Sequence, residues 1–368
     1  MIVAPGCLHA DRRDPDTKLR TKTCYRTYRN RGWCVLEMFA SFLSREKTHP
    51  TLLITSAMGT PEWNSPLEAQ KFAVGTCDFT CCQRNHKFGD KIVPCDRGIT
   101  RDILETLIES KIEMLFKTEN TKLGRLFHCM AHWWLRDSST ITTDTRYNIE
   151  VLKRELRWDE TKDEGTSIVD RCGFPLLCYA VLGNHLTAVK CILSSCRNSD
   201  VLSWKAPSGG VIEVGVPGHG TILGGAMIFA SSDVVIALLE AGVDVYGTDI
   251  MGNDGLMLAA SFGRLDNIKT WFSRNSDWKV NKGSGRYGTT ALHLAAYIGP
   301  GKLDTVRYLI EKKKADIHLL NKSGYSTLIL ACSNEDCDPK VVQYLLECGA
   351  GVHTQVKSQT KKWKTMRV

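Results

Sequence analysis

The chain has 368 residues, of which 43% are hydrophobic and 24% charged. This is the composition of a globular protein of roughly two or three domains. The longest apolar run, Trp33 to Leu43, is too short to span a membrane and contains Glu37. The first residues lack the basic and apolar regions of a secretory signal. The 15 cysteines, an odd number spread over both halves, favour reduced thiols over a disulfide framework. We therefore expect a cytoplasmic protein, with the nucleus as an alternative, and no membrane association.

The net charge of +8 comes mainly from basic residues near the two chain ends. One group runs from Arg12 to Arg31, and the other runs from Lys357 to Arg367 and includes Trp363. No known nucleic-acid motif accompanies either group, so we interpret both as solvated ends. Contact with nucleic acid or with an acidic partner is the alternative.

The first 98 residues predict a partial α/β module. The segments Ile2 to Ala4 and Thr51 to Thr55 are short and apolar, as buried strands are. Between them, apolar residues at helical spacing predict a helix that begins at Trp33. Its inward face would consist of Val35, Leu36, Phe39, Phe42 and Leu43. The predicted order is strand, loop, helix, strand.

The run Gly32-Trp33-Cys34-Val35-Leu36-Glu37 resembles the Ser-x-Trp-Cys-x-x-Glu-Leu helix of Toll/interleukin-receptor (TIR)-type domains. The resemblance covers about residues 1–60 and implies an α/β fold. In the NAD-cleaving members of that family the glutamate of this helix is catalytic, which implies that role for Glu37. Those members also need an earlier strand and loop, which would precede Ile2 here. We therefore interpret Glu37 as a solvated helix residue, and an NAD-consuming or signalling TIR-type domain is the alternative.

Four thiols and an imidazole follow within about 20 residues of sequence. They belong to Cys77, Cys81, Cys82, His86 and Cys95. We expect strands at 79–82 and 91–93 to form a hairpin that brings the last thiol back towards the others. Zinc sites use Cys and His on such hairpins, but the two-residue gap of a zinc knuckle is missing. We therefore expect half-buried cysteines and no cofactor, with zinc as the alternative.

Residues 99–164 predict a helical connector. Thr100 is the candidate N-cap of the first helix, and Leu123 to Leu135 form the second. His128 and His132 lie four residues apart in that second helix, but no glutamate lies between them, so we interpret them as core or surface residues. A third helix is predicted from Ile149 to Trp158, and we expect the three to cap the structure that follows.

From about residue 165 the sequence repeats itself. Five segments carry a leucine followed by small residues, and these leucines are Leu176, Leu223, Leu256, Leu292 and Leu328. They are about 47, 33, 36 and 36 residues apart, close to a period of about 33. A second apolar patch follows each segment. Each unit therefore predicts a pair of helices that stack on the next pair.

These segments resemble the ankyrin consensus Gly-x-Thr-Pro-Leu-His-x-Ala-Ala. The fourth segment is the best match, Thr290-Ala-Leu-His-Leu-Ala-Ala296. An Arg-Gly-Trp-Cys module ahead of such repeats is also similar to large uncharacterised ankyrin proteins of single-celled eukaryotes. The departures are Gly224-Gly225 inside a helix, Gly255 in place of proline, and an insertion at 198–220. Interior glycines cost about 1 kcal/mol each, which indicates divergent repeats.

We therefore expect a mainly α protein with three parts: a partial α/β module (1–98), the helical connector (99–164) and about five ankyrin repeats (165–368). The resemblance implies a monomeric, non-catalytic scaffold that binds a protein partner, while nucleic-acid binding is not expected. The partner would contact the concave face and the hairpin tips, near Tyr246, Asn253, Arg286, Tyr287, Asn321, Lys322 and Tyr325. Basic residues at two of the tips favour an acidic partner.

Overall fold

The computed structural model describes residues 2–3, 7–13, 20–23, 28–44, 51–54, 60–64, 66–137, 145–159, 170–195, 199–297, 302–333 and 338–352. The chain divides into two compact units, Met1–Ser138 and Ser139–Arg367. Within the described ranges, no helix has both the length and the apolar character needed to cross a membrane. The basic residues predicted after Lys357 lie outside the described residues.

The first unit contains two paired parallel strands that are separated along the sequence by a helix. Ile2 pairs with Leu53 and Val3 with Ile54, so β1 and β4 run in the same direction, and β5 adds an antiparallel edge. A separate hairpin joins β2 to β3. The bounds are β1 Ile2–Val3, β2 Cys7–Arg13, β3 Arg20–Thr23, β4 Thr51–Ile54 and β5 Glu62–Asn64. The order strand, helix, strand agrees with the sequence prediction, with the β2–β3 hairpin as an addition.

The core of the first unit is formed by three helices: α2 (Gly32–Phe42), α4 (Asp96–Lys117) and α5 (Thr121–Trp134). The ring of Phe42 stacks on Phe127 at 5.5 Å, and Phe39 lies 6.2 Å from Trp134. Aromatic contacts of this kind each contribute beyond the area they bury. These contacts join α5 to α2, and α4 packs against both helices, so α4 and α5 belong to the first unit.

The segment between α2 and α4 differs from the predicted hairpin. Residues 80–83 form a helical turn, α3 (Thr80–Gln83), and the hairpin consists only of β6 (Lys87–Phe88) and β7 (Lys91–Ile92). Helix α4 begins at Asp96 with Cys95 as N-cap, so Thr100 is an interior residue and the prediction of a cap there is wrong. The hydroxyl of Thr100 instead donates back to the Asp96 carbonyl at 2.9 Å. Two 3₁₀ turns, η1 (Pro66–Lys71) and η2 (Val74–Thr76), precede α3.

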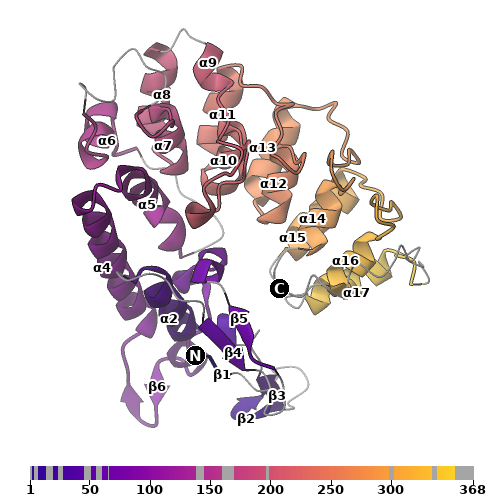
Figure 1. Cartoon of the computed structure of the whole chain (residues 1–368). Coiled ribbons are helices and arrows are strands. Elements are labelled where there is room, and N and C mark those ends of the chain that lie inside the picture. The colour runs from indigo at the N-terminus through magenta and orange to yellow at the C-terminus, as the bar shows by residue number, and fades with distance from the viewer. Residues whose placement is uncertain are drawn as a thin grey trace. The chain divides into compact units, whose positions relative to one another are not determined.

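The second unit begins with α6 (Ile149–Glu155), which packs against the helix pairs that follow. Five consecutive pairs lie side by side (Figure 1). They are α7 Leu176–Leu182 with α8 Leu186–Ser195, α10 Ile222–Phe229 with α11 Ser232–Glu240, α12 Gly255–Ser261 with α13 Leu265–Arg274, α14 Ala291–Tyr297 with α15 Leu303–Arg307, and α16 Thr327–Ser333 with α17 Pro339–Glu347. A π-helical turn, η4 (Tyr308–Lys312), continues α15. Four of the five predicted leucines are buried, and Leu176 is half-buried beside the buried Leu177.

The glycines that depart from the repeat consensus allow close contact between neighbouring helices. A Cβ atom on Gly224 of α10 would lie 2.9 Å from Leu258 of α12. On Gly255 it would lie 2.8 Å from the ring of Trp271. Both distances are shorter than side-chain contacts allow, so the helix propensity lost at these positions is offset by packing.

The insertion predicted at 198–220 contains α9 (Ser199–Leu202) and η3 (Ile212–Val214). Trp204 in this segment lies against Phe174, with ring centres 5.0 Å apart, and its indole N–H donates to the Gly173 carbonyl. The insertion is therefore folded onto the first two helix pairs.

Candidate functional site

A long loop or hairpin precedes each helix pair of the second unit, and the same turn lies just before the first helix of three pairs, α7, α12 and α16. A side-chain oxygen of Asp170, Asp249 or Asn321 accepts hydrogen bonds from the backbone N–H groups two and four residues later, at 2.8–3.0 Å. A glycine with positive φ follows three residues after each: Gly173, Gly252 and Gly324. Asp and Asn side chains stabilise such turns, and glycine takes the left-handed conformation without strain. This motif was not predicted, although an Asp or Asn three residues before a glycine is visible in the sequence.

Backbone hydrogen bonds join each hairpin to the next. The N–H of Ile250 donates to Gly218, that of Arg286 to Met251, and that of Lys322 to Tyr287. The N···O distances are 2.8, 3.2 and 2.9 Å respectively. The hairpin tips therefore form a continuous ladder along the repeats, and side chains that leave it share one surface.

Four of the seven residues predicted to contact a partner are exposed on these hairpins. We call them the hairpin surface: Tyr246, Arg286, Tyr287 and Lys322. Tyr325 is half-buried. Asn321 is only 9% exposed because it forms the turn described above, and Asn253 donates from its amide to Asp249 at 3.0 Å. The two asparagines therefore shape the hairpins and do not belong to the exposed surface.

Tyr246 is held in place by an aromatic stack. Its ring stacks on that of Trp278, with centres 5.2 Å apart and planes inclined by 28°, and Trp278 meets the buried Trp271 edge-on at 4.9 Å. The Lys282 ammonium lies 4.6 Å from the Trp278 ring and forms an ion pair with the buried Asp254 at 3.2 Å. Tyr246 is nevertheless 71% exposed. It is thus a large aromatic side chain that is fixed before any partner binds.

His293, the histidine of the best-matching repeat, has a structural position. Its Nδ1 accepts from the backbone N–H of Thr290 at 3.0 Å, so Nε2 carries the proton and donates to the Leu319 carbonyl at 3.1 Å. Burial lowers the pKa of this imidazole below its usual value, which favours the neutral form. The histidine therefore ties one hairpin to the next repeat.

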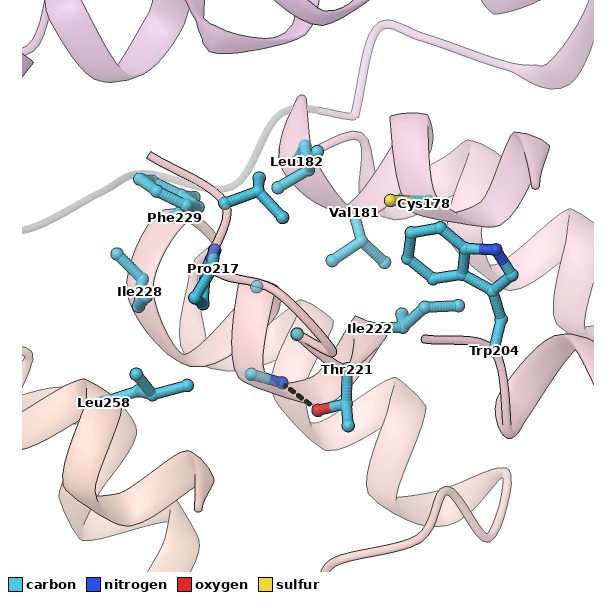
Figure 2. A pocket seen from close by; sticks show the side chains of 14 residues that line it. Cys178, Val181, Leu182, Trp204, Pro217, Thr221, Ile222, Ile228, Phe229 and Leu258 are labelled. Carbon is cyan, nitrogen blue, oxygen red and sulfur yellow. Dashed lines mark hydrogen bonds between the residues drawn. The ribbon is translucent and has the colours of Figure 1, made fainter. Parts of the chain in front are cut away.

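The apolar hollow between α7, α10 and the insertion is too small for a ligand. Its volume is about 20 Å³, and it is lined by apolar side chains that include Val181, Ile222 and Phe229 (Figure 2). That volume corresponds to about one water molecule, which needs polar partners that this lining hardly offers. We interpret the hollow as a gap in the packing between the first two repeats.

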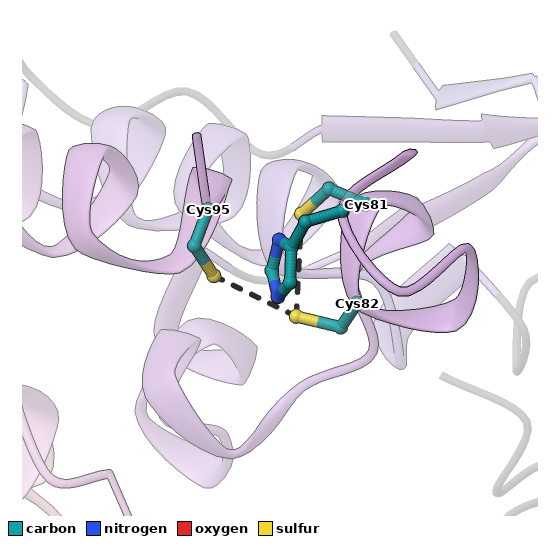
Figure 3. Close-up of side chains that lie close together, drawn as sticks. Cys81, Cys82 and Cys95 are labelled. Carbon is teal, nitrogen blue, oxygen red and sulfur yellow. Dashed lines mark hydrogen bonds between the residues drawn. The ribbon is translucent and has the colours of Figure 1, made fainter. Parts of the chain in front are cut away.

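The first unit brings four of the five predicted metal ligands together. One ligand atom from each of Cys81, Cys82, His86 and Cys95 lies within 4.8 Å of all the others. Figure 3 shows the three thiols pointing toward one another. Cys77 is outside this group: its thiol donates to the Ala73 carbonyl, and burial raises its pKa to about 12.

The pKa values of two thiols in the cluster, Cys82 and Cys95, shift in opposite directions. Desolvation, together with hydrogen bonds to Cys95 and Cys81, raises the pKa of the Cys82 thiol to about 11. A hydrogen bond from the backbone N–H of Arg97 lowers the pKa of the Cys95 thiol. This is the pattern expected where several acidic groups share a small volume.

The remaining predicted residues lie apart from both features. Glu37 is exposed on α2, and its carboxylate accepts a hydrogen bond from the Tyr28 hydroxyl at 2.8 Å. His128 and His132 are half-buried on α5, and Nδ1 of His132 lies 2.8 Å from the carbonyl oxygen of Cys129.

Comparison with known proteins identifies part of the second unit. A model of ankyrin repeats matches residues 256–356 with three copies. No curated protein matches the chain. The match begins at α12, so the helix pairs α7/α8 and α10/α11 precede it. Residues 256–356 are ankyrin repeats, a structure that supports interaction with other proteins in general.

Proposed function

We propose that the chain is a non-catalytic scaffold that binds a protein partner through the hairpin surface of its repeats. The observation that carries this proposal is the exposure of large, ordered side chains along a backbone-bonded row of hairpins. Binding energy at protein interfaces is concentrated in a few such residues, with tyrosine, tryptophan and arginine enriched. The repeat match supports a binding role in general, and the choice of surface is our inference from the geometry.

Tyr246 is the side chain we expect to contribute most. Its stacking on Trp278 fixes the ring, so little rotamer entropy is lost when a partner covers it. Tyr287, which is 41% exposed, lies under the guanidinium of Arg286 at 5.5 Å and extends the aromatic surface to the next hairpin. A partner that spans both hairpins would cover both rings.

The charge on the hairpins favours an acidic partner. Arg286 and Lys322 are exposed, and they lie on adjacent hairpins that are joined by a backbone hydrogen bond. Carboxylates on a partner would meet both cations, which speeds association and makes it sensitive to salt. Lys282 contributes less because it is already paired with Asp254.

The test is affinity capture with the full chain as bait. A triple variant, Tyr246→Ala, Arg286→Ala and Tyr287→Ala, removes the centre of the hairpin surface without touching the turns. The matched control changes two exposed lysines on helices, Lys269→Ala and Lys312→Ala. We expect proteins that are captured by the parent and by the control but lost by the triple variant, with capture that weakens as salt rises.

Equal capture by all three baits would reject the hairpin surface. A parent chain that captures nothing above a bead control would contradict the scaffold function itself. The alternative role of Glu37 in NAD chemistry stays a prediction. Glu37 accepts a hydrogen bond from the Tyr28 hydroxyl, and this interaction does not favour a catalytic role for the carboxylate.

A further inference from the structure

The ligand atoms of the cluster in the first unit are close enough to surround one metal ion. The Cys82 and Cys95 sulfurs are 3.6 Å apart, and those of Cys81 and Cys82 are 4.0 Å apart. Four ligands placed at a Zn–S distance of about 2.3 Å around one ion would be about 3.8 Å from one another. The two sulfur–sulfur distances are close to this value, and all four ligand atoms lie within 4.8 Å of one another, so a small shift of the side chains would place them around one ion.

The imidazole of His86 supplies an independent observation. Its Nδ1 is buried and has no hydrogen-bond partner among the residues that the structure describes. A buried nitrogen without a partner costs free energy, and coordination to a metal ion would remove that cost. We propose that Cys81, Cys82, His86 and Cys95 bind one Zn²⁺ ion in a closed, four-coordinate structural site.

The local backbone orients the ligands from both sides of the β6–β7 hairpin. Cys81 and Cys82 lie on α3, and the chain then passes through two left-handed residues, Asn85 (φ 51) and His86 (φ 57). Non-glycine residues adopt this conformation at a cost, and such strain is concentrated at functional positions. The N–H of His86 donates to the Cys81 carbonyl at 2.7 Å, and its carbonyl accepts from Val93 at 2.8 Å. These bonds fix the imidazole between the α3 thiols and the strand that leads to Cys95.

The surroundings favour negatively charged sulfur. Cys95 is the N-cap of α4, a helix of 22 residues whose N-terminus attracts anions. The backbone N–H of Asp96 already donates to the Cys81 sulfur at 3.4 Å. Backbone N–H groups directed at sulfur are the outer contacts that hold thiolate ligands in metal sites.

Zinc fits this donor set better than the common hard cations. Thiolate and imidazole are the ligands of Zn²⁺ in structural sites, whereas Mg²⁺ and Ca²⁺ require oxygen. With four protein ligands no position is left for water or substrate, so the ion would stabilise the fold and would not catalyse a reaction. It would link α3, the β6–β7 hairpin and the start of α4, all of them within the first unit.

The experiment measures metal on the full chain, which is purified under reducing conditions without chelator. We expect one zinc per chain by elemental mass spectrometry. Replacement by Co²⁺ should give the intense visible absorption of tetrahedral cobalt and a sulfur-to-cobalt charge-transfer band. Cys82→Ser and Cys95→Ser should abolish stoichiometric binding. The control variants Cys34→Ser and Cys77→Ser change cysteines of the same unit that lie outside the cluster. Both should still bind one zinc per chain.

A ligand variant that fails to fold would not leave the question open, because the parent chain can be tested alone. Added Zn²⁺ should protect three more thiols from a thiol-reactive chromophore, and a chelator should expose them again. A reduced parent chain that binds no zinc, or that shows the weak spectrum of six-coordinate cobalt, would overturn the proposal. So would equal loss of metal in the Cys34→Ser and Cys82→Ser variants, or an intramolecular disulfide in the cluster that persists under reducing conditions.

Discussion

Replacing Asn267 with leucine should destabilise the second unit, because this buried amide connects two repeats. Asn267 lies on α13 and is fully buried. Its Nδ2 donates to the carbonyls of Met227 and Ala230 at the end of α10, at 3.1 and 3.0 Å. In a continuing helix, the backbone N–H of Ser231 would donate to the Met227 carbonyl. It donates to Oδ1 of Asn184 instead. The Met227 carbonyl therefore depends on Asn267.

The expected magnitude follows from these two bonds. Losing one ordinary hydrogen bond costs about 1 kcal/mol, and leaving a buried carbonyl without a partner costs about 1–3 kcal/mol. The Ala230 carbonyl keeps a second donor, the guanidinium of Arg264 at 2.8 Å, so only the Met227 carbonyl is orphaned. Asn267→Leu should therefore lower the free energy of unfolding by about 2–4 kcal/mol.

The assay is urea unfolding of the full chain followed by helical circular dichroism, with separate transitions allowed for the two units. The matched control is Asn275→Leu, because the amide of Asn275, the C-cap of α13, donates to the Trp271 carbonyl of the helix that it caps. We expect the control to lose less than about 1 kcal/mol. Equal losses in the two variants would refute the hydrogen bonds that join α13 to the end of α10. They would also refute the extension of the repeats upstream of residue 256.

Three further outcomes are expected. Leu292→Ala, at a leucine that is 1% exposed, should cost about 2–5 kcal/mol in the same unfolding assay, and a loss below 1 kcal/mol would mean that the repeat register is wrong. Burial lowers the pKa of Lys302, which donates to the Ser261 carbonyl, from 10.5 to about 7. Between those values the unfolded chain binds a proton that the folded chain lacks, so this lysine destabilises the fold below pH 7 and the cost disappears towards pH 10.5. The stability of Lys302→Met relative to the parent should therefore fall by a few kcal/mol as pH rises from 7 to 10, and a constant difference would contradict the shift. Purified chain incubated with NAD should release no nicotinamide, because Glu37 is exposed and engaged by a tyrosine hydroxyl; turnover that disappears in Glu37→Ala would make the enzyme the leading hypothesis.

The repeat pattern predicted the helix pairs because each unit must bury the same positions against its neighbour. Thr221 has a residue type that favours helix N-caps, and its hydroxyl accepts from the Gly224 N–H at 2.9 Å. Gly242 and Gly349 follow the ends of α11 and α17 and have φ values of 80 and 86, a conformation that favours glycine. Local chemistry of this kind is visible in the sequence because both partners lie within a few residues.

Errors arose where the partner of a side chain is distant or is the backbone itself. Asn321 looked like a surface residue, but its oxygen binds two N–H groups of its own turn. Thr100 has the residue type of a cap, yet α4 starts four residues earlier, at Asp96. The buried Asn267 and Lys302 reach carbonyls about 40 residues away along the chain. No local pattern reports such pairs.

The proposed function is the binding of a protein partner at the hairpin surface. It is tested most directly by hydrogen exchange on the full chain with and without a partner obtained by capture. We expect slowed exchange in the backbone of residues 244–254, 283–289 and 319–325, which carry Tyr246, Arg286, Tyr287 and Lys322. Protection confined to residues 1–138, or to the helices of the repeats with these hairpins unchanged, would contradict it.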